Sequence, residues 1–269
     1  MNRCVAFAGP GTRGKPAGPV PLMSKRSTTA TYFDHQGIMR TAQPYELRPN
    51  YVYQNGVWVQ DGWLREGAST NLFQMDTTQA DLDGLLFDYN SNPKYQAITG
   101  FLPDICPDGV TRKIHLAPSS NVWVGFQSHA PIPYDASKNL LLSFFMKSYD
   151  TDNGHNVFTL TTYARDPSVT NGQNMGVKGV FYPLWSSANT AGCVNCGSGW
   201  YRYWFNWDAG NTGGSVWSSG QPVTVSISVA NPSWSYSKSI WGIQVEQGVS
   251  GPTSLIENTN ASIFSRYAD

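Results

Sequence analysis

Short stretches of β-branched and aromatic residues recur along this chain about every 8 to 15 residues from Ala30 onward. They are separated by Gly, Pro, Asn and Asp, and this rhythm of strands and turns is typical of all-β sandwiches. Helical periodicity is nearly absent, and only "TTQADLDGLLFD" (77–88) predicts a turn or two of helix. The pattern therefore constrains the chain to sheets joined by turns.

The clearest unit is "YVYQNGVWV" (51–59). Asn55 and Gly56 suit the two positive-φ positions of a type I′ turn, and aromatic or β-branched residues flank them on both sides. The segment therefore predicts a tight β-hairpin.

Further strands are expected at 112–117, 121–128, 140–148, 156–164, 176–183, 200–207, 222–230 and 239–247. In "VTVSISV" (223–229) the apolar residues alternate with Thr and Ser, so that one face packs on a core while the other meets water. This alternation is typical of an antiparallel sheet. The predicted fold is an all-β antiparallel sandwich of jelly-roll type, with no internal repeat.

Residues 1–29 are rich in Gly, Pro, Lys, Arg, Ser and Thr and show no periodicity, which predicts an extended N-terminal arm ahead of one jelly-roll domain at 30–269. Ordering such an arm costs roughly 1 to 2 kcal/mol per residue. We therefore expect the arm to be buried against a partner, as a particle-docking or subunit contact.

Charge and hydropathy exclude two partner classes. Eighteen basic residues balance eighteen acidic ones, so the chain lacks the positive field that nucleic acid binding requires. The first apolar run stops at Gly9 and Pro10, too early for a signal peptide, and no stretch approaches the roughly 20 apolar residues of a membrane-spanning helix. We expect a soluble protein or a part of a soluble assembly, without membrane insertion.

The cysteines and the Asp-rich turn do not predict a metal site. The "GCVNCG" segment holds Cys193 and Cys196 at CxxC spacing, but no second pair accompanies it, and its Gly-rich setting predicts a loop that leads into a strand. "YDTDNGHN" (149–156) resembles a calcium loop but lacks the distal bidentate acid, so a polar turn is favoured. No cofactor and no metal are expected.

The closing string "WGIQVEQGVSGPTSLIENTNASIFSRYAD" (241–269) resembles the C-terminal signature of a large family of phage tail and virion-surface proteins. Further stretches resemble that family's motifs in the same order, namely "TATYFDHQGIMRTA" (29–42), "WLREGASTNLF" (63–73), "PDGVTRKI" (107–114), "LLSFFMKS" (141–148) and "GSGWYRYWF" (197–205). The resemblance implies a jelly-roll domain related in architecture to carbohydrate-binding modules and lectin-like sandwiches. It implies a virion component and no established reaction.

The chain departs from the family pattern at Leu255-Ile256-Glu257, where Y-I-P is usual, and at "GCVNCG". The closing string is interpreted as the last strand, which seals the edge of the sandwich. Arg266 and Asp269 would then pair with or cap the opening "TYFD" segment.

Two carboxylates are the candidates for catalysis, because Glu66 and Glu246 could form a glycosidase pair at a suitable separation. Both lie inside the motifs of the resemblance, where a buried carboxylate usually binds backbone amides or an arginine such as Arg65 or Arg266. The structural role is favoured, and no G-x-S-x-G elbow accompanies the scattered histidines. We expect no enzyme and no catalytic residue.

Exposed tryptophans are the candidates for glycan binding, since an indole offers a flat apolar face for a sugar ring. The candidates are Trp185, Trp204, Trp217 and Trp234. In "WYRYWFNW" (200–207), Tyr201, Tyr203, Phe205 and Trp207 share the face expected in the core, which leaves Arg202, Trp204 and Asn206 on the other. For each tryptophan, packing in the core or at a subunit interface remains the alternative.

The favoured function is a non-enzymatic virion structural protein, as a fibre, spike or decoration, displayed on the virion surface after assembly in the host cytoplasm. Expected partners are other virion proteins through the arm and further copies of the chain, as a homotrimer, because the aromatic content exceeds the needs of one core. The alternatives are an adhesin for host surface polysaccharide and, less favoured, a polysaccharide depolymerase or esterase.

Overall fold

The computed structural model describes residues 24–73, 86–87, 102–116, 125–127, 132–133, 135, 137–148, 158–165, 175–181, 191–207, 222–228, 238–256 and 264–268. Every regular element in these ranges is a β-strand. The same residues contain no helix that is long and apolar enough to cross a membrane.

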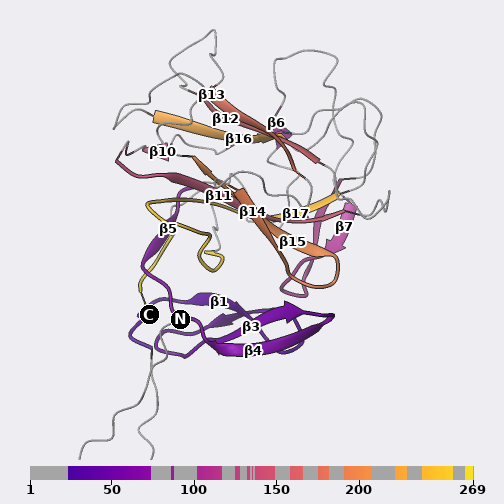
Figure 1. The fold of residues 1–269 in the computed structure, drawn as a ribbon, viewed down its shortest axis with the longest axis vertical. Helices are drawn as coiled ribbons and strands as arrows, with labels where there is room; N and C mark the ends of the chain where they lie inside the picture. The colour runs from indigo at the N-terminus through magenta and orange to yellow at the C-terminus, as the bar shows by residue number, and fades with distance from the viewer. Residues whose placement is uncertain are drawn as a thin grey trace, which may run out of the picture.

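Two six-stranded antiparallel sheets form the body of the protein (Figure 1). The outer sheet runs in the order β13 (Met175–Phe181), β12 (Phe158–Arg165), β16 (Pro222–Ser228), β9 (Gly125–Gln127) and β6 (Leu86–Phe87), with β10 (Ile132–Pro133) also paired to β16. The central sheet runs β14 (Ala191–Asn195), β15 (Trp200–Trp207), β11 (Leu140–Ser148), β17 (Lys238–Gln247), β8 (Thr111–Leu116) and β7 (Leu102–Ile105). The expected all-β sandwich is confirmed.

A third layer covers the other face of the central sheet (Figure 1). This N-terminal layer, residues 24–63, contains the hairpins β1 (Ala30–Phe33) with β2 (Met39–Ala42) and β3 (Pro49–Gln54) with β4 (Val57–Trp63). Phe33 joins the layers, because its ring stacks on Trp58 at 4.9 Å and meets the edge of Phe145 of β11 at 6.3 Å. Beside these layers, β5 (Ser69–Asn71) pairs with β18 (Phe264–Arg266).

Strand β11 shows that the central sheet is buried on both faces, since every residue from Leu140 to Met146 is at most 1% exposed. Side chains alternate across a strand, so Phe144 and Phe145 point to opposite faces. Phe144 packs on the rings of Tyr203 and Phe205, with centroids 5.9 and 6.3 Å away. Tyr203 and Phe205 therefore lie in the core, as predicted.

The predicted hairpin is present, with Gln54 opposite Val57. Asn55 and Gly56 have φ values of 49° and 85°, the left-handed pair that a type I′ turn requires. The short side chain of Asn and the missing Cβ of Gly make this conformation accessible.

Most other strand predictions are confirmed, with ends displaced by a few residues. Of the strand expected at 121–128, the described part is β9. The helical turn expected within 77–88 is wrong at Leu86 and Phe87, which form β6 and pair with Phe126 and Gly125; the remainder of that segment lies outside the described residues. Pairing at the sheet margin overrides the weak local helical tendency there.

The predicted arm at 1–29 lies outside the described residues up to position 23, but its last part belongs to the N-terminal layer. The backbone N–H of Ser24 donates to the carbonyl of Tyr45 at 3.1 Å. The fully buried Arg26 donates to the carbonyls of Gln43 and Glu46, each at 3.1 Å. Local composition could not reveal this anchoring.

Replacement of Gly192 by Ala should destabilise the fold. Gly192 of β14 lies opposite Trp204 of β15, and a Cβ built on it would stand 2.3 Å from Trp204 Cζ2. Because the indole must move, we expect a loss of about 1–3 kcal/mol in the free energy of unfolding, measured by urea denaturation. Gly251→Ala is the control, since a Cβ there has no atom within 4 Å. Equal stability of the two variants would contradict this packing.

Candidate functional site

A buried polar surface lies on the face of the central sheet that Phe145 shares. Ser143, Gln244 and Glu246 are fully buried there, and Arg202 is 8% exposed. Charged residues are rarely buried unless they are paired. We name these residues, together with the groups that cover them, the buried polar network. The covering groups are Thr31, Arg48, Glu66, Thr253 and Ser254.

Glu246 fixes the loop that follows β17. Its carboxylate accepts hydrogen bonds from the backbone N–H and hydroxyl of Thr253, at 3.2 and 2.6 Å, and from the hydroxyl of Ser69. Two residues before it on β17, the side-chain oxygen of Gln244 accepts the backbone N–H of Ile256 at 2.7 Å. These contacts lay residues 251–256 across the sheet.

Glu66 connects the N-terminal layer, the loop and β18. Its carboxylate accepts the backbone N–H of Ser254 at 2.6 Å, pairs with Arg48 at 2.8 Å and stands 3.5 Å from Arg266. Arg48 also donates to the Thr31 carbonyl at 3.1 Å. The contacts expected for Glu66 and Glu246 are present, since both carboxylates bind backbone amides and Glu66 binds two arginines.

The expected contact of Arg266 with the opening "TYFD" segment is wrong, whereas its expected pairing with a carboxylate is confirmed. Arg266 pairs with Glu66 and donates to the Gly67 carbonyl at 2.8 Å, because β18 runs beside β5 and not beside the "TYFD" segment. In that segment Asp34 pairs with Arg40 at 2.7 Å. The end of the chain still contacts residues before β1, since Tyr267 N–H donates to the Thr28 hydroxyl at 3.0 Å. Asp269 lies outside the described residues.

Arg202 is the cation at the centre of the polar surface. Its guanidinium donates to the Thr253 carbonyl at 2.6 Å and to the Ser143 hydroxyl at 3.0 Å, and it lies 5.1 Å from the centre of the Phe145 ring. Burial lowers the pKa of Arg202, while the nearby Glu246 carboxylate opposes this shift. A cavity of about 180 Å³ beside Arg202 separates part of the N-terminal layer from the sheet.

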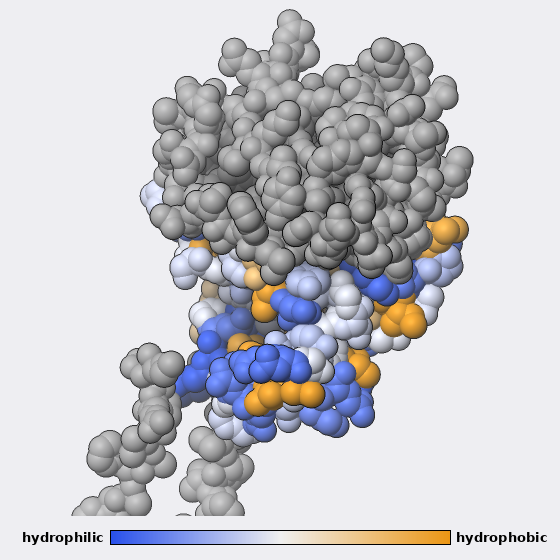
Figure 2. Space-filling view, turned by 45° about the vertical axis from the view of Figure 1, so that its right-hand side comes forward, coloured by the Kyte–Doolittle hydropathy of each residue, from blue (hydrophilic) through white to orange (hydrophobic). Residues whose placement is uncertain are grey.

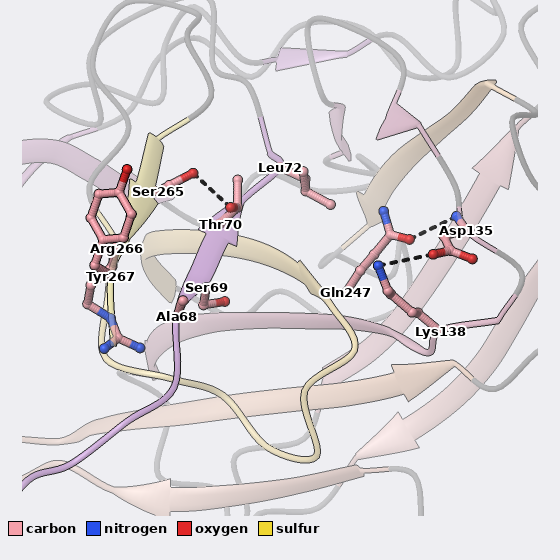
Figure 3. A pocket seen from close by; sticks show the side chains of 10 residues that line it. All are labelled: Ala68, Ser69, Thr70, Leu72, Asp135, Lys138, Gln247, Ser265, Arg266 and Tyr267. Carbon is pink, nitrogen blue, oxygen red and sulfur yellow. Dashed lines mark hydrogen bonds and ion pairs between the residues drawn. The ribbon is translucent and has the colours of Figure 1, made fainter. Parts of the chain in front are cut away.

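A larger groove, of about 520 Å³, lies at the side of the sandwich (Figure 3). We name it the C-terminal groove. It is lined by Ala68, Ser69, Thr70, Leu72, Asp135, Lys138, Gln247, Ser265, Arg266 and Tyr267. These residues come from β5, β18, the end of β17 and the turn before β11.

Polar side chains form both sides of the C-terminal groove (Figure 3). On one side the hydroxyls of Thr70 and Ser265 lie 2.8 Å apart. On the other, Lys138 pairs with Asp135 at 3.0 Å, and Asp135 N–H donates to the Gln247 side-chain oxygen at 2.9 Å. Hydrogen bonds from Ser137 and Lys138 lower the pKa of Asp135 to about 2, so its carboxylate is ionised at neutral pH.

Of the four tryptophans predicted for glycan binding, Trp204 lies within the described residues. Trp185, Trp217 and Trp234 lie outside the described residues. Trp204 is half-buried against Gly192 and shares its face with Arg202. Sequence reasoning missed the C-terminal groove, although "STN" and "SRY" at its margin fall within the motifs of the resemblance.

The CxxC segment differs from the predicted loop, because residues 191–195 form β14 and pair with β15. Cys106, Cys193 and Cys196 form no disulfide, and the described residues contain no cluster suited to a metal ion. Burial raises the pKa of Cys193, and that of Cys106 and Cys196 to about 12. The Asp-rich segment 149–156 lies outside the described residues.

In comparisons with known proteins, no family model matches this chain and no curated protein matches its sequence.

Loss of a buried arginine should cost far more than loss of an exposed one. The Arg48 side chain is fully buried and that of Arg40 is 47% exposed, yet each pairs with one carboxylate. We expect Arg48→Gln to lower the free energy of unfolding by about 3–5 kcal/mol, because Glu66 loses a buried partner. Arg40→Gln should cost at most about 1 kcal/mol. Chemical denaturation measures both, and similar losses would contradict the network.

The buried thiols should resist alkylation in the native protein. With its pKa raised from 9.0 to about 12, a thiol at about pH 8 is ionised in roughly one molecule in ten thousand, compared with roughly one in ten. We expect Cys106 and Cys196 to react with iodoacetamide only after denaturation, as peptide mass spectrometry would show. Rapid native labelling at either cysteine would contradict the burial.

Proposed function

We propose that this protein is a structural component of a phage virion, displayed on the particle as a fibre, spike or decoration. The observation that carries the proposal is the meeting of the resemblance motifs in one place. Thr31, Glu66, Ser143, Arg202 and Glu246 come from separate motifs, and all belong to the buried polar network. Motif residues that hold a fold together support a shared architecture better than they support a shared reaction.

The strand order supports the jelly-roll type that belongs to this proposal. The central sheet contains β8-β17-β11-β15, and the outer sheet contains β9-β16-β12-β13. Successive strands β8 and β9, β11 and β12, and β15, β16 and β17 alternate between the two sheets. In jelly rolls, eight antiparallel strands form two Greek keys whose connections pass from one sheet to the other in this way.

Self-association, as a homotrimer, is part of the proposal and is supported by exposed apolar residues on the N-terminal layer. Val57, Val59 and Trp63 of β4 are 58%, 44% and 52% exposed. Figure 2 shows apolar side chains on the surface of this layer. Exposed apolar strands are suited to burial against another protein. The N-terminal residues would bind other virion proteins, with no catalytic step involved.

Immunogold labelling of intact particles tests the proposal. An antibody against the whole chain should place gold at one defined location on the virion by electron microscopy, and particles lacking the gene for this chain provide the control. Label at the tail tip would favour attachment, and label on the head would favour decoration. Absence of label, with the antibody active on the purified protein, would overturn the proposal.

A further inference from the structure

We propose that the C-terminal groove binds an uncharged saccharide chain. If this binding serves to attach a virion to a host cell surface, that role rests on the proposed virion function. The binding chemistry itself depends only on the groove. A saccharide ligand is favoured by the size of the groove, the kinds of polar group along it, its charge balance and an exposed aromatic ring.

The size of the groove suits a ligand of several sugar rings in an open site. Its volume of about 520 Å³ lies within the roughly 300–1,000 Å³ of small-molecule sites in proteins. Figure 3 shows Leu72 between the two polar sides, where it supplies an apolar contact. A trough with polar sides and an apolar residue between them matches a sugar, whose hydroxyls radiate from an apolar ring face.

The polar groups can both donate and accept hydrogen bonds, as sugar hydroxyls require. Thr70 and Ser265 carry hydroxyls that act in either sense, Lys138 only donates and ionised Asp135 only accepts. Thr70 and Ser265 are exposed at their mutual hydrogen bond. A ligand therefore meets both donors and acceptors along the two sides.

The charge balance selects against an ionic ligand. The ammonium of Lys138 and the carboxylate of Asp135 neutralise each other at 3.0 Å. The Arg266 guanidinium does not offer its charge to the groove, because its side chain is 1% exposed and is held by Glu66 and the Gly67 carbonyl. Among the described residues that line the groove, phosphate and acidic sugars would find no uncompensated cation.

Tyr267 provides the stacking surface. It is 61% exposed and lies at the margin of the groove (Figure 3). Its backbone is fixed by the hydrogen bond to Thr28 and by the strand that precedes it. An exposed tyrosine ring can pack against a sugar ring while its hydroxyl remains able to hydrogen-bond, and a fixed backbone reduces the entropy lost on binding.

The test is saturation-transfer difference NMR with the purified full-length protein and four uncharged probes: maltohexaose, cellohexaose, chitohexaose and β-1,4-galactohexaose. We expect at least one probe to bind, with a dissociation constant between about 1 μM and about 1 mM. Tyr267→Ala should weaken that binding about tenfold, whereas Tyr267→Phe should keep it within about threefold, because the ring is retained. A charged control, a sialylated hexasaccharide, should not bind.

Tyr45→Ala is the matched control variant, because Tyr45 is also an exposed aromatic, at 50%, but lies between β2 and β3 of the N-terminal layer, outside the groove. It should leave binding unchanged.

Gln247→Ala and Lys138→Ala should each weaken binding about fivefold. Their urea midpoints should stay near that of the parent protein, which would show that both variants are folded. Failure of all four probes to bind, or binding unaffected by Tyr267→Ala, would overturn the proposal. If the antibody labels particles but the protein binds no probe, the saccharide proposal fails and the virion function stands. If the protein binds a probe but the antibody labels no particles, the virion function fails and saccharide binding stands.

Discussion

The carboxylate of Glu66 joins the N-terminal layer to the last strand and to the loop that covers the central sheet. It binds Arg48 from the N-terminal layer, Arg266 from the last strand and the backbone amide of Ser254 from the loop that follows β17. Burying these charges costs several kcal/mol of hydration for each ion, which only close pairing and added hydrogen bonds can offset. The arginines obtain those bonds from the carbonyls of Thr31 and Gly67. Arg48 of the N-terminal layer and Arg266 near the end of the described chain are thereby fixed to one carboxylate.

This anchoring also shapes the C-terminal groove through the alternation of side chains on two short strands. On β5, Ser69 and Asn71 are buried and bind Glu246 and the carbonyls of Ile243 and Ile256, while Thr70 between them faces outward. On β18, Arg266 is buried while its neighbours Ser265 and Tyr267 are exposed. The period of two therefore separates residues that hold the strands from residues that a ligand can contact. Rigid support of this kind favours precise binding.

The features predicted from the sequence were those set by neighbouring residues. Asn55-Gly56 specifies its turn by backbone conformation alone, and the alternation in 200–207 placed Tyr203 and Phe205 in the core. The structural roles of Glu66 and Glu246 followed from a second kind of argument, the scarcity of buried carboxylates without partners. The failures concern contacts across long stretches of chain. The placement of β18 away from the "TYFD" segment, the burial of Arg26 and the meeting of Thr70 with Ser265 depend on contacts between distant segments that no local pattern specifies.

The burial of the central sheet also explains why Trp204 does not face open solvent, although the alternation in its strand suggested that it would. A position that alternates away from the core of a two-layer sandwich should face water, and on that reasoning Trp204 was a candidate. Here the second face of the sheet is covered by the N-terminal layer and by residues 251–256, so that Arg202 beside it is buried and Trp204 packs on Gly192. Open surface is then found where the covering elements end, at the margin formed by β5 and β18. Because Tyr267 is 61% exposed at that margin, it and its hydroxyl-bearing neighbours are better placed for a ligand than the half-buried indole of Trp204.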